Sequence, residues 1–194
     1  TLTLVLSNAW TNDTTRADAL ATQDGVRVLN SDKTRRLVGT IRATAATTTE
    51  DSGLKRFVLN EQNRVPRYIV CTDTTSHTYT TETWRPWNNS GVVRLEAVFD
   101  GQAAVRFTYL CSSSSDSAAN ARKVGFGVDT TTANHAAAAE IAIQGLGSNY
   151  YTELTSVLNT VLAEGYHYIA PLEWGLATGT ATWLGFYMEA TLWM

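Results

Sequence analysis

The sequence lacks the residue patterns that mark most metalloproteins and many enzyme families. Its three histidines, His77, His135 and His167, stand far apart and have no partner at a metal-binding spacing. No G-x-S-x-G elbow, phosphate-binding loop or dinucleotide-binding fingerprint occurs. We therefore expect no metal site, no cofactor and no enzymatic activity. A glycan hydrolase or esterase that uses two paired carboxylates is the less favoured alternative.

Long apolar runs and a strong net charge are also missing. No stretch approaches the roughly 18 apolar residues that span a bilayer, so we expect no membrane insertion. The net charge is −3 and the pI is near 5.6, and we expect no nucleic-acid binding because no overall field attracts a polyanion. The first residue is Thr1 rather than methionine, so we expect a piece of a longer polypeptide. Whether a stalk precedes Thr1 is left open.

Cysteine is scarce, with Cys71 and Cys111 as the only two. Both lie in segments that alternate as strands do, and nothing else resembles a small disulfide-stapled domain. We expect two buried free thiols, with a disulfide as the alternative.

Threonine, serine and turn-forming residues are abundant, and no segment has a sustained helical pattern. About ten short strands separated by turns predict an all-β fold. We expect residues 1–194 to form a single jelly-roll-like antiparallel β-sandwich. With 44% hydrophobic and 17% charged residues, the chain can bury a core of that size.

Three features predict local strand structure. Asp24-Gly25 between two apolar runs predicts a hairpin. Residues 93–99 and 103–111 each place apolar residues on one face, and we expect them to pair through a three-residue loop with Gly101 in a left-handed conformation. The third is the run from Val124 to Val128, where glycine alternates with large residues, so one face must lie against another backbone or a bulky ring.

The segment from Tyr150 to Leu162 permits two interpretations. Its apolar spacing matches a helix, but its many β-branched residues favour a strand. We predict a strand.

Seven of the fifteen basic residues, nearly half, lie in the stretch from Arg35 to Arg67. They are Arg35, Arg36, Arg42, Lys55, Arg56, Arg64 and Arg67. The favoured interpretation is a network in which Glu50, Asp51 and Glu61 pair with these residues, because partly buried charges need partners. An interface between identical subunits is the main alternative, and an anion-binding site is disfavoured by the overall charge.

The same segment resembles a module of tail fibre and other virion structural proteins of tailed bacteriophages. The pattern of that module runs TTRRYLGTxRT, then TEDS, then KRFVWNxxNRVPR. The matching residues are Thr34, Arg35, Arg36, Leu37, Gly39, Thr40, Arg42, Thr49, Glu50, Asp51, Ser52, Lys55, Arg56, Phe57, Val58, Asn60, Asn63, Arg64, Val65, Pro66 and Arg67. Leu59 departs from the pattern, which has Trp there. The segments AWTNDTTRADAL, QDGV and GYHYIAPLEW also fit, so the resemblance covers most of the chain.

This resemblance implies a structural protein located in the phage virion, in a tail fibre or a capsid appendage. The segments 165–174 and 181–186 are also similar to the closing strands of trimeric jelly rolls of the C1q and TNF kind. Residues 183–194 are apolar on both faces, and one subunit alone leaves such a strand without cover. Because tail fibre proteins are trimers, we expect a homotrimer that contacts other virion proteins.

A tryptophan-rich segment and a tyrosine pair are the candidate ligand-binding residues. Trp84, Arg85, Trp87, Tyr150 and Tyr151 could bind a host-surface saccharide through rigid aromatic faces. The favoured interpretation of Trp84 and Trp87, however, is that they cover one end of a sheet. A purely architectural capsid or tail adaptor without a ligand is the alternative function.

Overall fold

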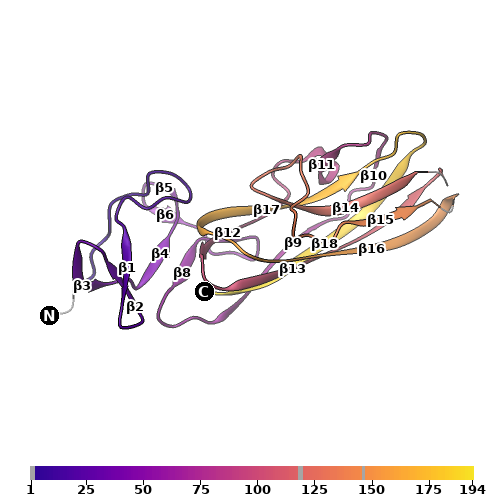
Figure 1. Cartoon of the computed structure of the whole chain (residues 1–194). Coiled ribbons are helices and arrows are strands. Elements are labelled where there is room, and N and C mark those ends of the chain that lie inside the picture. The colour runs from indigo at the N-terminus through magenta and orange to yellow at the C-terminus, as the bar shows by residue number, and fades with distance from the viewer. Residues whose placement is uncertain (1–2, 118–119, 146) are drawn as a thin grey trace.

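The computed structural model describes residues 3–117, 120–145 and 147–194. A β-sandwich occupies one end of an elongated molecule, and small sheets from the first sixty residues lie at the other end (Figure 1). The small sheets are β1 (Leu20–Gln23), β2 (Val26–Leu29) and β3 (Asp32–Arg36); β4 (Gly39–Ile41) with β8 (Val58–Asn60); and β5 (Ala43–Ala45) with β6 (Thr48–Thr49). The predicted hairpin at Asp24-Gly25 is confirmed as the turn between β1 and β2.

The sandwich consists of two sheets. All of their strand pairs are antiparallel except one, in which a short strand pairs in parallel at the edge of the second sheet. The first sheet has β9 (Pro66–Asp73) and β10 (His77–Tyr79), both paired with β18 (Ala181–Trp193), then β13 (Ala104–Ser115) and β16 (Gly147–Val161). The second sheet runs β15 (Ile141–Gln144), β14 (Ala121–Val128), β17 (Glu164–Trp174), β12 (Leu95–Asp100) and β7 (Lys55–Arg56). In addition, β11 (Trp84–Pro86), which leads into a 3₁₀ turn at Trp87–Asn89, pairs with β17.

The order of these strands is that of a jelly roll. From β10 onward the chain passes back and forth between the two sheets, and the last strand, β18, lies between β10 and β13. The second-last strand, β17, lies between β12 and β14 in the same way. Two interlocked Greek keys produce this order. The predicted jelly-roll-like all-β fold is confirmed, and trimer formation stays a prediction.

The predicted hairpin between residues 93–99 and 103–111 is wrong. β12 belongs to the second sheet and β13 to the first, so the two consecutive strands cross the sandwich instead of pairing. Gly101 does take the expected left-handed conformation, with φ +76. Both apolar faces point into the core, but from opposite sheets. The alternation therefore identified the buried face correctly and could not identify the partner strand.

The ambiguous segment after Tyr150 is a strand, as predicted. It forms β16, which pairs with β13 along most of its length. Leu154, Ser156 and Leu158 are buried and alternate with more accessible residues. This period of two, together with the β-branching, outweighs the helical spacing of the leucines.

The glycines of β14 allow other segments to approach the outer side of the second sheet. A Cβ at Gly127 would stand 2.0 Å from the carbonyl oxygen of Thr130, and one at Gly125 would stand 3.3 Å from the Trp84 ring. The predicted contact with a backbone or a bulky ring is confirmed. As a result, Leu172 is buried even though it lies on the outward-facing side of β17.

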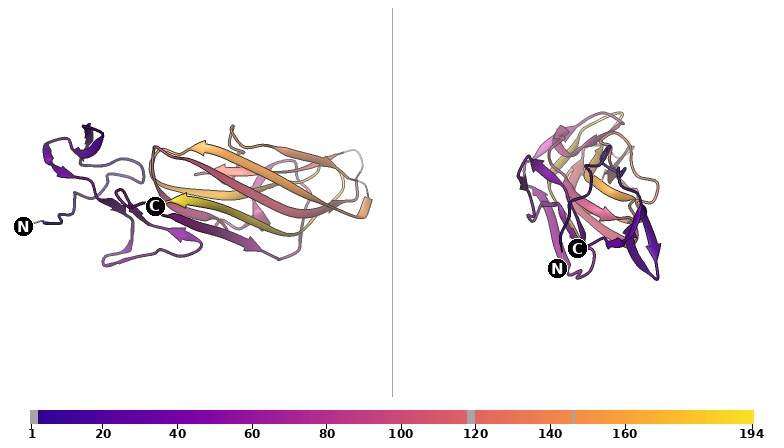
Figure 2. Two further views of the ribbon diagram at one scale, coloured as in Figure 1. Left: turned by 90° about the horizontal axis from the view of Figure 1, so that it is seen from below. Right: turned by 90° about the vertical axis from the view of Figure 1, so that its left-hand side faces the viewer.

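The first sixty residues are anchored to the sandwich by backbone hydrogen bonds. The Val70 N–H donates to the Gly53 carbonyl at 2.7 Å, the Glu96 N–H to the Leu54 carbonyl at 3.2 Å, and the Tyr166 N–H to the Asp13 carbonyl at 2.8 Å. The C-terminus lies at the end of the sandwich that faces the small sheets (Figures 1 and 2). One hydrophobic cluster extends from Leu59 of β8 into the sandwich. The single domain over residues 1–194 stays a prediction.

Cys71 and Cys111 are both free and buried. They lie on β9 and β13, the two strands that flank β18, so a whole strand separates them and a disulfide cannot form without movement of the backbone. Burial raises the pKa of each thiol to about 12. Both cysteines are therefore protonated core residues.

Asp100, at the end of β12, makes the stability sensitive to acid. Burial opposes its charge, but N–H donors of Gln102 and Ala103 and the guanidinium of Arg64 hold its pKa below the usual value. A carboxyl with a lowered folded-state pKa contributes stability above its unfolded pKa, near 3.9, and that stability is lost as the pH falls through the folded value. We expect Asp100→Asn to cost about 1–3 kcal/mol at neutral pH and progressively less below about pH 4.

Chemical denaturation at several pH values tests this expectation. Asp24→Asn, in the exposed turn between β1 and β2, is the matched control and should leave the profile unchanged. A cost of Asp100→Asn that is the same at every pH would contradict the assignment.

Candidate functional site

The charged residues between Lys33 and Arg67 form ion pairs within the chain. Lys55 pairs with Glu50, Arg56 with Asp51, and Arg64 with Glu61, at 3.3, 3.3 and 2.8 Å. Of the other predicted members, Arg35 pairs with Asp32, Arg42 pairs with Asp13, and Arg36 donates to the side chain of Gln62. The predicted pairing of Glu50, Asp51 and Glu61 is therefore present. A contribution of this cluster to a subunit interface stays a prediction.

The tryptophan-rich segment is packed into the protein. Trp87 is fully buried, and its ring centroid lies 4.9 Å from that of Phe186. The ring of Trp84 packs edge-on against Trp174, at 5.3 Å between centroids. Trp87 therefore offers no face to a ligand in this structure, and Trp84 offers only part of one. The sequence favoured two rings that cover one end of a sheet; in the structure Trp87 belongs instead to the hydrophobic core cluster, and Trp84 is only partly buried.

Arg85, between the two tryptophans, is also held by internal contacts. Its Nε donates to Glu173 at 2.6 Å, and its guanidinium lies 3.7 Å from the centroid of the Tyr79 ring. Glu173 is fully buried and also bonds His77, at 2.6 Å. No sequence motif indicates this His77–Glu173–Arg85 cluster, because its members come from three strands that the fold brings together.

Tyr150 and Tyr151 are the predicted ligand-binding residues that remain exposed. Their exposed fractions are 63% and 54%. They lie near the start of β16, at the end of the sandwich remote from both termini (Figure 1). The structure does not bring them into contact with the Trp84 cluster. Ligand binding by the two tyrosines stays a prediction.

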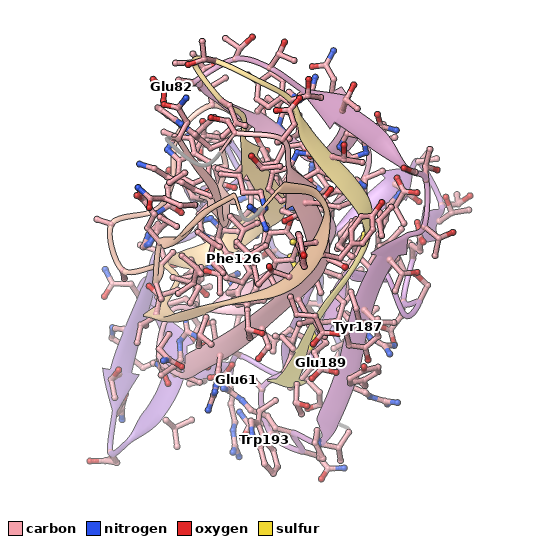
Figure 3. All side chains as sticks on the ribbon, turned by 90° about the vertical axis from the view of Figure 1, so that its right-hand side faces the viewer. Glu61, Glu82, Phe126, Tyr187, Glu189 and Trp193 are labelled. Carbon is pink, nitrogen blue, oxygen red and sulfur yellow. The ribbon has the colours of Figure 1, made fainter. Side chains whose placement is uncertain are left out.

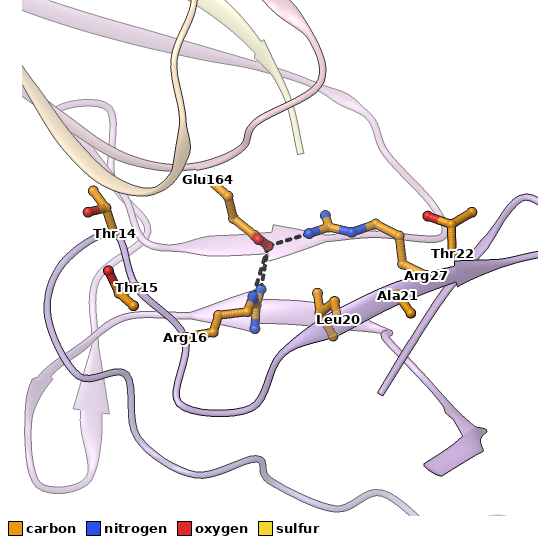
Figure 4. A pocket seen from close by; sticks show the side chains of 8 residues that line it. All are labelled: Thr14, Thr15, Arg16, Leu20, Ala21, Thr22, Arg27 and Glu164. Carbon is orange, nitrogen blue, oxygen red and sulfur yellow. Dashed lines mark hydrogen bonds and ion pairs between the residues drawn. The ribbon is translucent and has the colours of Figure 1, made fainter. Parts of the chain in front are cut away.

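A polar pocket lies between the first hairpin and the start of β17 (Figure 4). At its centre the Glu164 Oε1 atom accepts hydrogen bonds from Arg16 Nε at 2.9 Å and from Arg27 Nη2 at 2.5 Å. The wall is completed by Thr14, Thr15, Leu20, Ala21 and Thr22. The volume of the cavity is about 460 Å³. Sequence reasoning singled out neither Arg16 nor Arg27 for a site.

Close backbone approach fixes the geometry of this pocket. Gly165 has φ +128, and a Cβ there would stand 2.4 Å from the carbonyl oxygen of Asp13. Only glycine allows the loop before Arg16 to lie against the start of β17. Arg16 is further fixed by a hydrogen bond to Thr40 at 2.6 Å and by the Trp10 ring, 4.4 Å from its guanidinium carbon.

The outer face of the first sheet carries several exposed apolar side chains. We call it the bare face and define it by Tyr68, Leu110, Val161, Leu184, Tyr187 and Trp193, which are all exposed. Leu110 and Tyr187 are directly opposite each other on β13 and β18. Tyr187 and Trp193 follow one another along β18, with Glu189 between them (Figure 3). The hydroxyl groups of Tyr68 and Tyr187 both donate to Glu189.

The described part of the chain contains no helix long and apolar enough to cross a membrane. Among the same residues, no group of three or more His, Cys, Asp and Glu side chains could hold a metal ion.

Comparisons with known proteins show similarity at the level of β-rich domains only. No family model matches the chain, and no curated protein matches its sequence. The solved structures that are similar include the following three. The sugar-binding EclA C-terminal domain has 10% identity and a TM-score of 0.34, over 60% of this chain and 78% of that one. A structure of infectious bursal disease virus, Gx strain, has 12% identity and a TM-score of 0.40, over 87% and 41%.

The third is a family two carbohydrate esterase from Cellvibrio japonicus, with 13% identity and a TM-score of 0.25, over 68% of this chain and 36% of that one. The chain thus spans less than half the length of the viral and esterase chains. At these TM-scores the similarity supports no argument about activity, ligand or assembly.

Proposed function

We propose that the chain is a structural module of a phage virion, in a tail fibre or a related appendage, and that it assembles as a homotrimer through the bare face. The observation that carries the proposal is the contrast between the two sheets. The outer side of the second sheet is covered by the chain's own segments, which bury Leu172. The outer side of the first sheet exposes Leu110, Tyr187 and Trp193.

Burial of the bare face has a favourable free energy. Removing apolar surface from water contributes roughly 25 cal/mol for each Å². Large exposed apolar patches mark association sites more often than not, and most homo-oligomers close by rotational symmetry. The choice of three copies rests on the resemblance of the Lys33–Arg67 segment to tail fibre modules.

A single charge at the centre of the bare face tests this interface. We expect Leu110→Lys to convert the trimer to single chains, because a lysine buried between subunits has no partner. Val92→Lys is the matched control, since Val92 is an exposed loop residue, at 80%, away from the bare face. Sedimentation velocity measures the mass, and circular dichroism checks that both variants keep the β fold. A Leu110→Lys variant with the mass of the wild type would refute the interface.

Recognition of a host-surface saccharide, in this proposal, belongs to the end of the sandwich remote from the termini. Tyr150 and Tyr151 expose rigid aromatic rings there, and such rings stack on sugars with little loss of entropy. Other virion proteins would bind at the opposite end. An apolar groove of about 650 Å³ lies there, between the segment that contains Leu4 and Leu6 and the β4–β8 pair.

A glycan array, combined with a turnover assay on host polysaccharide, separates the possible activities. The proposal predicts binding that is weakened in a Tyr150→Ala/Tyr151→Ala variant, without cleavage. Absence of any binding would favour a purely architectural adaptor. Cleavage of the polysaccharide would contradict the expectation of a non-enzymatic module.

A further inference from the structure

We propose that the polar pocket around Glu164 is a second binding site, which takes a neutral polyol such as the vicinal diol of a saccharide unit. The pocket lies at the end of the sandwich near the termini, remote from Tyr150 and Tyr151. The proposal rests on the pocket alone and depends neither on trimer formation nor on the tyrosine pair.

The charges around the pocket are balanced, and this selects a neutral ligand. Three guanidinium groups and three carboxylates form one connected set: Arg16, Arg27 and Arg64 with Glu61, Glu164 and Asp100. An anion entering the pocket would meet the Glu164 carboxylate, and a cation would meet the two arginines that Glu164 binds. A neutral ligand that binds through its hydroxyl groups meets neither penalty.

The pocket also offers one donor and one acceptor that the protein leaves unused. Arg27 Nη1 is buried and has no hydrogen-bond partner, and its nearest carboxylate oxygen is Glu61 Oε1, 3.5 Å away. All hydrogen bonds to Glu164 from the described residues reach Oε1, which leaves Oε2 free as an acceptor. A buried donor without a partner carries a desolvation penalty that a ligand acceptor would relieve.

A vicinal diol is complementary to this pair of groups. One hydroxyl can donate to Glu164 Oε2 while the neighbouring hydroxyl accepts from Arg27 Nη1, since each hydroxyl is both donor and acceptor. Threonine hydroxyls at positions 14, 15 and 22 line the same space, and Leu20 and Ala21 supply an apolar wall. A cavity of about 460 Å³ is within the size range of small-molecule sites.

The site is held in place before any ligand arrives. Thr22 and Arg27 are cross-strand partners on the β1–β2 hairpin, so the strand pairing sets their separation. Glu164 is positioned by the start of β17, where Gly165 allows the close contact with Asp13. Such preorganisation lowers the entropic cost of binding.

Saturation-transfer NMR tests the proposal on the whole chain carrying Tyr150→Ala/Tyr151→Ala, which removes the tyrosine pair as a second source of signal, with the methyl α-glycosides of glucose, mannose and galactose as probes. Thr22→Tyr should abolish the signal, because the ring fills the pocket while every ion pair is kept, and tyrosine is well tolerated in strands. Gln23→Tyr is the matched control, on the same strand but outside the pocket lining, and should keep the signal. We expect Arg27→Gln to weaken binding roughly tenfold or more, as loss of a charged hydrogen bond requires.

Several results would overturn the proposal. They are no signal from any of the three glycosides, a signal that persists in Thr22→Tyr, and displacement of the glycosides by inorganic phosphate, which would mark an anion site. A signal that is present in the wild-type chain but absent once Tyr150 and Tyr151 are replaced would place all binding at the other end. Thr22→Tyr keeps the test decisive if Arg27→Gln fails to fold.

Discussion

Replacing Glu173 with leucine is expected to lower the free energy of unfolding by about 3–5 kcal/mol, the usual cost of breaking a buried ion pair from one side. Glu173 is fully buried between the sheets and binds both Arg85 and His77 at 2.6 Å. Without the carboxylate, a largely buried guanidinium and an imidazole lose their partner. Urea denaturation at neutral pH measures the change.

Glu153→Leu is the matched control for this substitution. Glu153 lies on β16, where its side chain is exposed, so the same chemical change should shift the unfolding free energy by no more than about 0.5 kcal/mol. Adding Arg85→Met to Glu173→Leu should recover part of the loss, because the uncompensated charge is removed as well. A cost of Glu173→Leu that equals that of the control would show that the cluster is not a structural element.

The second large effect is expected from one added methyl group. Gly127→Ala should destabilise the protein by about 3 kcal/mol or more, at the upper end of the cost of overpacking a core. The new Cβ would stand 2.0 Å from the Thr130 carbonyl oxygen, and a backbone atom cannot move aside as a side chain can. Relief requires the connection after β14 to lift from the sheet and expose Leu172.

Gly91→Ala is the control for Gly127→Ala. No atom lies within 4 Å of the position that a Cβ at Gly91 would take, so this change should be close to neutral. Thermal unfolding of the two variants, followed by circular dichroism, compares them directly. Equal unfolding temperatures for the two variants would show that the connection after β14 is not in close contact with the sheet.

The amino-acid pattern predicted which face of each strand is buried better than it predicted which strands pair. Alternation in residues 124–128 correctly predicted a glycine face in close contact, and β-branching correctly predicted the strand β16. The same kind of alternation led to a wrong hairpin between β12 and β13. A strand that points apolar residues inward looks the same in either sheet of a sandwich, so local pattern cannot distinguish pairing from crossing.

The candidate sites were less predictable than the fold. The internal pairs of Glu50 and Asp51 follow from charges that are close in sequence. The pocket at Glu164, in contrast, joins Arg16 to a residue 148 positions away. Such long-range contacts depend on how the first hairpin docks on the sandwich, and no local motif encodes that docking. Exposed residues such as Tyr150 could be named from sequence, but their role depends on a ligand.

The molar mass of the wild-type chain in solution, measured by light scattering over a dilution series, tests the central claim most directly. The account predicts three chains of 21.2 kDa each, persisting on dilution, because the bare face is covered only in the assembly. A mass of one chain at every concentration would contradict the trimer. The exposed Leu110, Tyr187 and Trp193 would then belong to the surface of a free-standing domain.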